Sequence, residues 1–165
     1  VLGPSEKVRP DDLGEPRANV PGAVLGRRLR EDVAEPWIAR FEGVDARLEL
    51  IEKAQHNARH NQLQNAEFRL ADLYSPEAPD PWGAERFDQW LLDPPRTGAV
   101  ELVQRLPAHG GPRRILYVSC NSGTLARDSA VLVHSKGYRL TAAGVMDMFP
   151  QTKHVEAMAL FERNN

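Results

Sequence analysis

The stretch from Ile115 to Asp128 reads Ile-Leu-Tyr-Val-Ser-Cys-Asn-Ser-Gly-Thr-Leu-Ala-Arg-Asp. Its apolar first part is rich in β-forming residues and predicts a strand that ends at Ser119, and the residues from Ser122 to Lys136 predict a helix. Three apolar side chains of this helix are expected to face the core: Leu125, Leu132 and Val133. A strand that leads into a helix is typical of an open α/β sheet, in which ligands bind at the carboxyl ends of the strands.

Cys120 is the only cysteine of the chain and falls in the short link between this strand and this helix. A helix N-terminus supplies a positive field that favours a thiolate, so one interpretation of Cys120 is a nucleophile. The other interpretation is a small buried hydrophobe, which is the common role of a free cysteine.

Two further motifs accompany this cysteine. Upstream, a short apolar run from Phe87 to Leu92 is followed by Asp-Pro-Pro-Arg-Thr-Gly at residues 93–98, and downstream residues 146–156 read Met-Asp-Met-Phe-Pro-Gln-Thr-Lys-His-Val-Glu. In this order and at this spacing, from about Phe41 to Arg163, the three motifs resemble the RNA uracil-C5 methyltransferases, which use S-adenosylmethionine to form 5-methyluridine. The residues after the cysteine, with Asp-Met-Phe-Pro later, are more similar to the branch that acts on large-subunit ribosomal RNA than to the tRNA branch.

The resemblance implies a Rossmann-like class I methyltransferase fold, an α/β sheet with helices on both faces and a C-terminal antiparallel strand pair. Members of this family carry an Asp-x-x-x-Gly-x-Gly loop after the first strand, around the methionine part of the cofactor. This sequence has no such loop, and Gly-Ala-Val-Leu-Gly at residues 22–26 is the nearest approach. We therefore expect the first strand and its glycine loop to be missing or altered. Residues 1–35 are expected to be an atypical leader that is disordered or loosely packed, and residues 36–165 a partial methyltransferase catalytic domain.

The composition limits the class of protein. The chain has 165 residues and a formal net charge of −2, so it is one domain or part of one, and any contact with RNA must be local. A single cysteine excludes an internal disulfide and a four-thiolate iron–sulfur cluster within this chain. No apolar run approaches the roughly 20 residues that cross a bilayer. We expect a cytoplasmic monomer without a membrane partner, acting on RNA, and on rRNA rather than tRNA.

The remaining elements follow from periodicity and turn residues. We expect strands at Trp37–Phe41, Ala66–Leu70, Phe87–Leu92, Tyr138–Met146 and Ala157–Phe161, and helices at Val44–Asn61 and Ala99–Leu106. The first helix is expected to bury one face, formed by Val44, Leu48, Ile51, Ala54 and Ala58. His56 and His60 are four residues apart, a spacing that can bind metal, but no third ligand accompanies them and no metal site is expected.

Three acidic residues are candidates for contacts with the cofactor. Glu42 follows a predicted strand, and an acid at a strand end can accept hydrogen bonds from ribose hydroxyls; the resemblance assigns the matching acid this role, although a solvated surface glutamate is the alternative. By the same resemblance, Asp72 lies beside the adenine ring. Asp93 stands at a strand tip and is held in a fixed direction by two prolines, so it can face the cofactor or accept a hydrogen bond from the uracil N3–H.

Two polar residues near these motifs are candidates for contacts with the substrate. Asp-Pro-Pro is similar to a motif of amino-directed N-methyltransferases, but an aromatic residue follows it there and Arg96 follows it here, which argues against that branch. Arg96 is expected to hold either an RNA phosphate or an internal carboxylate. Asn121, beside Cys120, is expected to contact the substrate.

The chemistry that the family implies needs a nucleophile and a base. Uracil C5 is a poor nucleophile, and addition of the Cys120 thiolate at C6 makes it electron-rich. Glu156 is the candidate base that removes the C5 proton, because a carboxylate partly desolvated by Val155 and Ala157 is a better base near neutral pH; a solvated glutamate is the alternative. The target uridine is expected to be unpaired or flipped. A competing hypothesis is an inactive remnant or RNA-binding fragment that cannot hold the cofactor.

Overall fold

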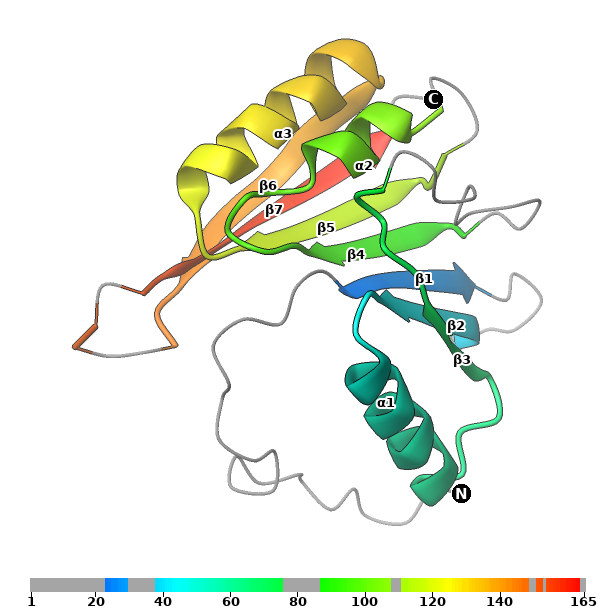
Figure 1. The fold of residues 1–165 in the computed structure, drawn as a ribbon. Helices are drawn as coiled ribbons and strands as arrows, with labels where there is room; N and C mark the ends of the chain where they lie inside the picture. The colour runs from blue at the N-terminus through cyan, green and yellow to red at the C-terminus, as the bar shows by residue number, and fades with distance from the viewer. Residues whose placement is uncertain are drawn as a thin grey trace, which may run out of the picture.

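The computed structural model describes residues 23–29, 38–75, 87–107, 111–148, 151–152 and 154–163. These residues form a seven-stranded sheet of order β3-β2-β1-β4-β5-β7-β6 and three helices. The strands are β1 (Ala23–Leu29), β2 (Ile38–Asp45), β3 (Ala66–Leu70), β4 (Gln89–Asp93), β5 (Arg114–Ser119), β6 (Tyr138–Met146) and β7 (Glu156–Arg163). The helices are α1 (Leu48–His60), α2 (Val100–Arg105) and α3 (Ser122–Ser135). Figure 1 shows α1 on one face of the sheet and α2 and α3 on the other, so helices cover both faces as expected.

The strand directions place most carboxyl ends at one edge of the sheet. β2 and β3 are parallel, β4 and β5 are parallel, and β1 is antiparallel to both β2 and β4. β7 is antiparallel to β5 and β6, which confirms the expected C-terminal antiparallel pair. Strands β2 to β6 therefore share one direction, and their carboxyl ends lie at the same edge as the first residue of β7. We call this the site edge.

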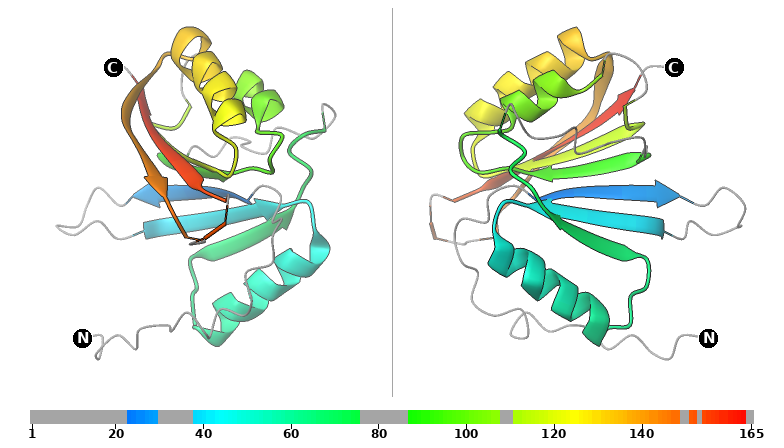
Figure 2. Two further views of the ribbon diagram at one scale, coloured as in Figure 1. Left: turned by 90° about the vertical axis from the view of Figure 1, so that its left-hand side faces the viewer. Right: turned by 45° about the vertical axis from the view of Figure 1, so that its right-hand side comes forward.

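The third position of the seven-stranded sheet holds a strand of unexpected direction. β1 lies between β2 and β4, and it pairs with both from a segment that we expected to be a disordered or loosely packed leader. The first strand is thus altered rather than missing, and the leader expectation does not hold for Ala23–Leu29; residues 1–22 and 30–37 lie outside the described residues. Because Ala23 pairs with Asp93, the carboxyl end of β1 lies at the edge opposite the site edge, as the two views in Figure 2 also show.

Two boundaries near β2 differ from the prediction. The strand expected to end at Phe41 continues to Asp45, because residues 41–44 are paired on one side with β1 and residues 41–45 on the other with β3. The following helix therefore begins at Leu48 and not at Val44, and Leu48 is 56% exposed. Ile51 and Ala58 are buried, as the helical pattern predicted.

The core lies between the sheet and the pair α2 and α3. Its fully buried side chains come from strands and helices alike, among them Leu92, Val103, Ile115, Tyr117, Leu132 and Phe161. Leu125 and Leu132 face this core as expected, but Val133 is 37% exposed, since it lies about 100° further around α3 than Leu132. Gly137 follows α3 with a φ of +73°, which is the left-handed conformation that ends many helices.

Candidate active site

Cys120 and Glu156 lie next to each other at the site edge. β5 ends at Ser119, one residue before Cys120, and β7 begins at Glu156. In the antiparallel ladder of these two strands, Ser119 pairs with Ala157, so Cys120 and Glu156 are the next residues beyond that pair. Both are half-buried. The structure thus brings together the two residues that we predicted to be the nucleophile and the base.

Asp93 belongs to the same place. It is the last residue of β4, and β4 pairs with β5 up to Leu92 and Tyr117. Burial raises the pKa of the Asp93 carboxyl above its ordinary value, and the charge of Glu156 raises this pKa further. Asp93 is thus the next residue beyond the Leu92–Tyr117 pair, and it lies at the same edge of the sheet as Cys120 and Glu156.

The link that carries Cys120 is fixed from both sides. The Ser119 hydroxyl accepts the Asn121 N–H at 3.1 Å and donates to the Asn121 carbonyl at 3.1 Å. Asn121 caps α3, because its Oδ1 accepts the N–H groups of Gly123 at 3.0 Å and Thr124 at 3.4 Å. Its Nδ2 donates to the Arg96 carbonyl at 3.2 Å. Both ends of the Asn121 amide therefore have internal partners, and its contact with a substrate stays a prediction.

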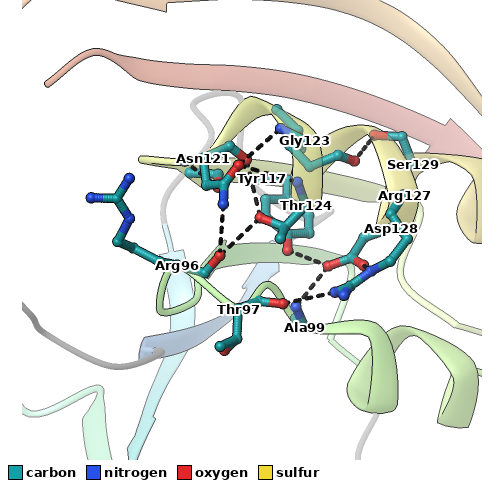
Figure 3. A network of polar contacts seen from close by, with 12 residues as sticks. Arg96, Thr97, Ala99, Tyr117, Asn121, Gly123, Thr124, Arg127, Asp128 and Ser129 are labelled. Carbon is teal, nitrogen blue, oxygen red and sulfur yellow. Dashed lines mark hydrogen bonds and ion pairs between the residues drawn. The ribbon is translucent and has the colours of Figure 1, made fainter. Parts of the chain in front are cut away.

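The segment after Asp93 is held by α3, as Figure 3 shows. The Arg96 carbonyl accepts hydrogen bonds from Asn121 and from the Thr124 hydroxyl, and the Thr97 carbonyl accepts one from Arg127 Nη2 at 2.8 Å. The side chain of Arg96 is exposed and extends away from this network. Among the described residues it forms no ion pair, and its expected contact with an RNA phosphate or an internal carboxylate stays a prediction.

The acid at the end of β2 is a different residue from the one we predicted. Glu42 lies within β2, and its carboxylate forms an ion pair of 2.7 Å with Arg69 Nη2 of β3. Asp45 ends the strand; it is 5% exposed and accepts the Arg47 N–H at 2.8 Å. Nothing in the residues after Phe41 indicates that the strand continues, and for this reason Asp45 was not predicted at the strand end. The ribose contact of Glu42 stays a prediction.

Asp72 lies just past β3, as expected, and forms a turn with a tyrosine that the sequence analysis did not identify. Its Oδ1 accepts the Tyr74 N–H at 2.9 Å. Tyr74 is half-buried. Burial raises the pKa of its hydroxyl, and so do four nearby carboxylates, those of Glu101, Asp128, Asp72 and Asp93. Tyr74 therefore belongs to the acidic surroundings of the site edge.

Comparison with known proteins agrees with these positions. The family model described as tRNA (Uracil-5-)-methyltransferase matches residues 83–164. The 23S rRNA (uracil(1939)-C(5))-methyltransferase RlmD of Thiobacillus denitrificans is 53% identical over 122 residues, which cover 73% of this chain and 28% of that protein. The protein of the same name from Alkalilimnicola ehrlichii is 55% identical over 139 residues, with coverages of 84% and 29%. Over these residues the chain belongs to the RNA uracil-C5 methyltransferase family.

The fold of this uracil-C5 methyltransferase chain is similar to the folds of solved structures. The Pyrococcus abyssi tRNA (uracil-54, C5)-methyltransferase, in complex with S-adenosyl-L-homocysteine, is 37% identical with a TM-score of 0.59, over 73% of this chain and 28% of that one. TrmN from Thermus thermophilus matches with a TM-score of 0.53 at 18% identity, over 74% and 36% of the two chains, which shows the fold alone. These matches confirm the class I methyltransferase fold. The chain spans less than a third of the length of the curated relatives quoted above.

Two further observations on this family member concern metal binding and membrane insertion. The rings of His56 and His60 stack with their centroids 6.4 Å apart, and both residues are exposed. Across the described ranges, no group of three or more His, Cys, Asp or Glu side chains is arranged to hold a metal ion. The helices of the described part of the chain are also too short or too polar to cross a membrane.

Proposed function

We propose that this chain carries the catalytic residues of an S-adenosylmethionine-dependent enzyme that methylates uridine C5 in RNA, with 23S rRNA as the substrate and the bacterial cytoplasm as the place of action. Identities of 53% and 55% to enzymes named for 23S rRNA support the substrate. The observation that carries the proposal is the register of β5 and β7, which sets Cys120 beside Glu156 at the site edge.

In this proposal Cys120 and Glu156 act on the same pyrimidine ring in turn. The Cys120 thiolate forms a bond to uracil C6, and the electrons of the C5–C6 double bond move into an enolate whose C5 then accepts a methyl group. Glu156 removes the remaining C5 proton, the C5–C6 double bond forms again, and the thiolate leaves C6. Asp93 orients the base by accepting a hydrogen bond from its N3–H. An unpaired or flipped uridine can reach these groups at the edge of the sheet.

The cofactor would lie along the same edge. When bound, S-adenosylmethionine supplies an electrophilic methyl group. The described residues fit its adenosine part, because acidic side chains stand at the carboxyl ends of three strands: Asp45 of β2, Asp72 after β3, and Asp93 of β4. Glu42 lies three residues before the end of β2. We propose Glu42, Asp72 and Asp93 as the cofactor contacts, as the family resemblance implies.

One observation favours a second candidate function, an inactive remnant or an RNA-binding fragment. β1 is antiparallel to β4, so the carboxyl end of β1 lies at the edge opposite the site edge. A loop that follows β1 is therefore not at the site edge, where it would have to be to hold the methionine part of the cofactor. Calorimetric titration separates the two candidates. Micromolar binding of S-adenosylmethionine supports the enzyme, whereas no binding at millimolar concentration supports the remnant.

Covalent capture tests the proposed function directly. RNA that carries 5-fluorouridine should form a denaturation-resistant adduct with the chain in the presence of cofactor, because the C5 fluorine cannot be removed as a proton. Cys120→Ser and Cys120→Ala should abolish both methylation and this adduct. Ser135→Ala, at the far end of α3, is the matched control and should form the adduct normally. Turnover by either Cys120 variant would refute the assignment of the nucleophile.

A further inference from the structure

Asp128 is a fully buried carboxylate that the proposed reaction does not use. It lies in α3 and is 0% exposed. Its Oδ2 accepts the Tyr117 hydroxyl at 2.6 Å and the Ala99 N–H at 2.6 Å, and its Oδ1 accepts Arg127 Nε at 2.8 Å. Burial of a carboxylate away from water costs free energy unless several hydrogen-bond donors satisfy its oxygens. Asp128 and its three donors therefore form one hydrogen-bonded cluster.

The same face of α3 binds a run of backbone groups in the segment after β4. Thr124 follows Asn121 by three residues, and Arg127 and Asp128 follow Thr124 by three and four, so these side chains lie on one side of the helix. Together they bind the Arg96 carbonyl, the Thr97 carbonyl and the Ala99 N–H. Three of the four backbone positions from residue 96 to residue 99 are therefore fixed by one helix, as can be followed in Figure 3.

Gly98 shows how closely this segment approaches the helix. Its φ is +82°, and a Cβ atom at this position would lie 2.6 Å from Arg127 Nη2 and 2.6 Å from Asp128 Oδ2. The Gly98 N–H also donates to the Pro95 carbonyl at 2.8 Å, which closes the turn. A residue with a side chain does not fit between the turn and the ion pair of Arg127 and Asp128.

These contacts begin where the strand ladder ends. β4 and β5 are paired up to Leu92 and Tyr117, and Tyr117 is itself a hydrogen-bond partner of Asp128. Beyond this pair, Asp93 lies on one strand end and Cys120 three residues past Tyr117 on the other. In the described part of the chain, the contacts from α3 are what join the two segments that leave β4 and β5.

From this geometry we propose that Asp128 and Arg127 are positioning residues that fix the direction of Asp93 relative to the Cys120 thiol. The inference rests on the proposed function, because it concerns the same site. Neither residue touches the reacting atoms. Asp128 acts through the Ala99 N–H and Tyr117, and Arg127 acts through the Thr97 carbonyl.

The full chain allows the two residues to be tested with matched variants. Arg127 is 45% exposed in its side chain, so Arg127→Gln removes the contact to the Thr97 carbonyl and the ion pair with Asp128 without opening the core. Arg139→Gln is the control, since Arg139 is 67% exposed and pairs with Glu162 at 3.7 Å, away from this network. Arg127→Lys keeps a donor and a charge. Asp128→Asn keeps the shape of the buried side chain but removes its charge.

Three readouts are measured on each variant: the hydrogen exchange of the Ala99 amide, the affinity for 5-fluorouridine RNA, and the rate of its covalent capture. In Asp128→Asn the Ala99 amide should exchange about tenfold faster or more, because a hydrogen bond to a charged group is lost. In Arg127→Gln the capture rate should fall about tenfold at unchanged RNA affinity, since misplacing reacting groups slows the chemical step more than binding. Arg127→Lys should recover part of the capture rate, and Arg139→Gln should match the wild type.

The outcomes separate this inference from the proposed function. The positioning role is overturned if the Ala99 amide of Asp128→Asn exchanges as in the wild type, or if Arg127→Gln captures RNA at the wild-type rate. In either case, capture by the unmodified chain still supports the proposed function. If the unmodified chain captures no RNA, the proposed function fails, and the exchange of the Ala99 amide still decides whether Asp128 holds the segment. Should Asp128→Asn fail to fold, Arg127→Gln decides: exchange of the Ala99 and Gly98 amides faster than in Arg139→Gln supports the inference, and equal exchange overturns it.

Discussion

Tyr117 donates its hydroxyl hydrogen to Asp128 Oδ2 over 2.6 Å, and both side chains are completely buried. The bond joins the last residue of β5 that pairs with β4 to the second turn of α3. Burial raises the pKa of the Tyr117 hydroxyl, and the hydrogen bond to Asp128 raises this pKa further, so the hydroxyl remains a donor in neutral solution. Asp128 Oδ2 of α3 therefore accepts hydrogen bonds from both Tyr117 of β5 and the Ala99 amide.

Tyr117→Phe should destabilise the protein by about 1–3 kcal/mol, because Asp128 loses one donor inside the core. Chemical denaturation measures the loss. Tyr138→Phe is a matched control, since the buried Tyr138 hydroxyl donates to the Pro112 carbonyl at 2.7 Å. Both variants should be less stable, but only Tyr117→Phe should speed exchange of the Ala99 amide; equal exchange in the two variants would contradict the shared network.

Glu156→Gln should stop the reaction after methyl transfer, because the amide cannot remove the C5 proton. A protein–RNA adduct should then accumulate with ordinary uridine RNA and appear as a shifted band on a denaturing gel. Glu162→Gln, at the other end of β7, is the control and should leave no adduct. If Glu156→Gln gives turnover without an adduct, another group is the base.

The stability of the protein should depend on pH through Asp93. Its pKa in the folded protein lies above the ordinary value of 3.8, owing to burial and then to Glu156. A raised pKa means that the contribution of Asp93 to stability is fully present below pH 3.8 and is lost as pH rises through the raised value. Asp93→Asn should therefore be more stable than the wild type at pH 7.

Denaturation at several pH values checks this sign. The advantage of Asp93→Asn should shrink as pH falls toward 3.8. In Glu156→Gln one of the two causes is removed, so the pKa of Asp93, followed by NMR, should fall toward its ordinary value without reaching it. An Asp93 pKa unchanged in Glu156→Gln would show that the two carboxylates do not interact.

Gly98→Ala should be more destabilising than Gly137→Ala. Both glycines have positive φ values, +82° and +73°, so an alanine at either position costs on the order of 1 kcal/mol in backbone strain. A Cβ at Gly98 would also meet Arg127 and Asp128 at 2.6 Å, whereas a Cβ at Gly137 would meet no atom within 4 Å. Thermal denaturation of the two variants should separate backbone strain from steric crowding. Equal losses of stability would show that the segment around Gly98 can shift at no cost in free energy.

The sequence predicted the bounds of several elements well. The expected strand at Ala66–Leu70 and that at Tyr138–Met146 have the observed bounds, and α3 differs from its expected range by one residue. These segments are bounded by local signals. Gly137 ends α3, and turn residues bound the apolar residues of each of the two strands. Such signals depend on neighbours in sequence, so they can be read without the fold.

Boundaries that depend on pairing could not be predicted in this way. β2 continues to Asp45 because β1 and β3 pair with it on either side, and nothing in the residues from Phe41 to Asp45 indicates a ladder. The direction of β1 is also a property of the sheet, since the same extended segment can pair in either direction. Asp128 looks like an ordinary polar residue of a helix until Tyr117 and Ala99 are brought to it.

The sequence by itself determined the family, the order of most elements and the identity of Cys120, Asp93 and Glu156 as candidate residues, because short motifs and turn residues carry this information locally. Only the tertiary structure decided that Cys120 and Glu156 are adjacent across two strands, that Asp128 joins their surroundings to α3, and that β1 runs against its neighbours. Contacts between residues far apart in the chain depend on register and strand direction, which sequence spacing does not fix.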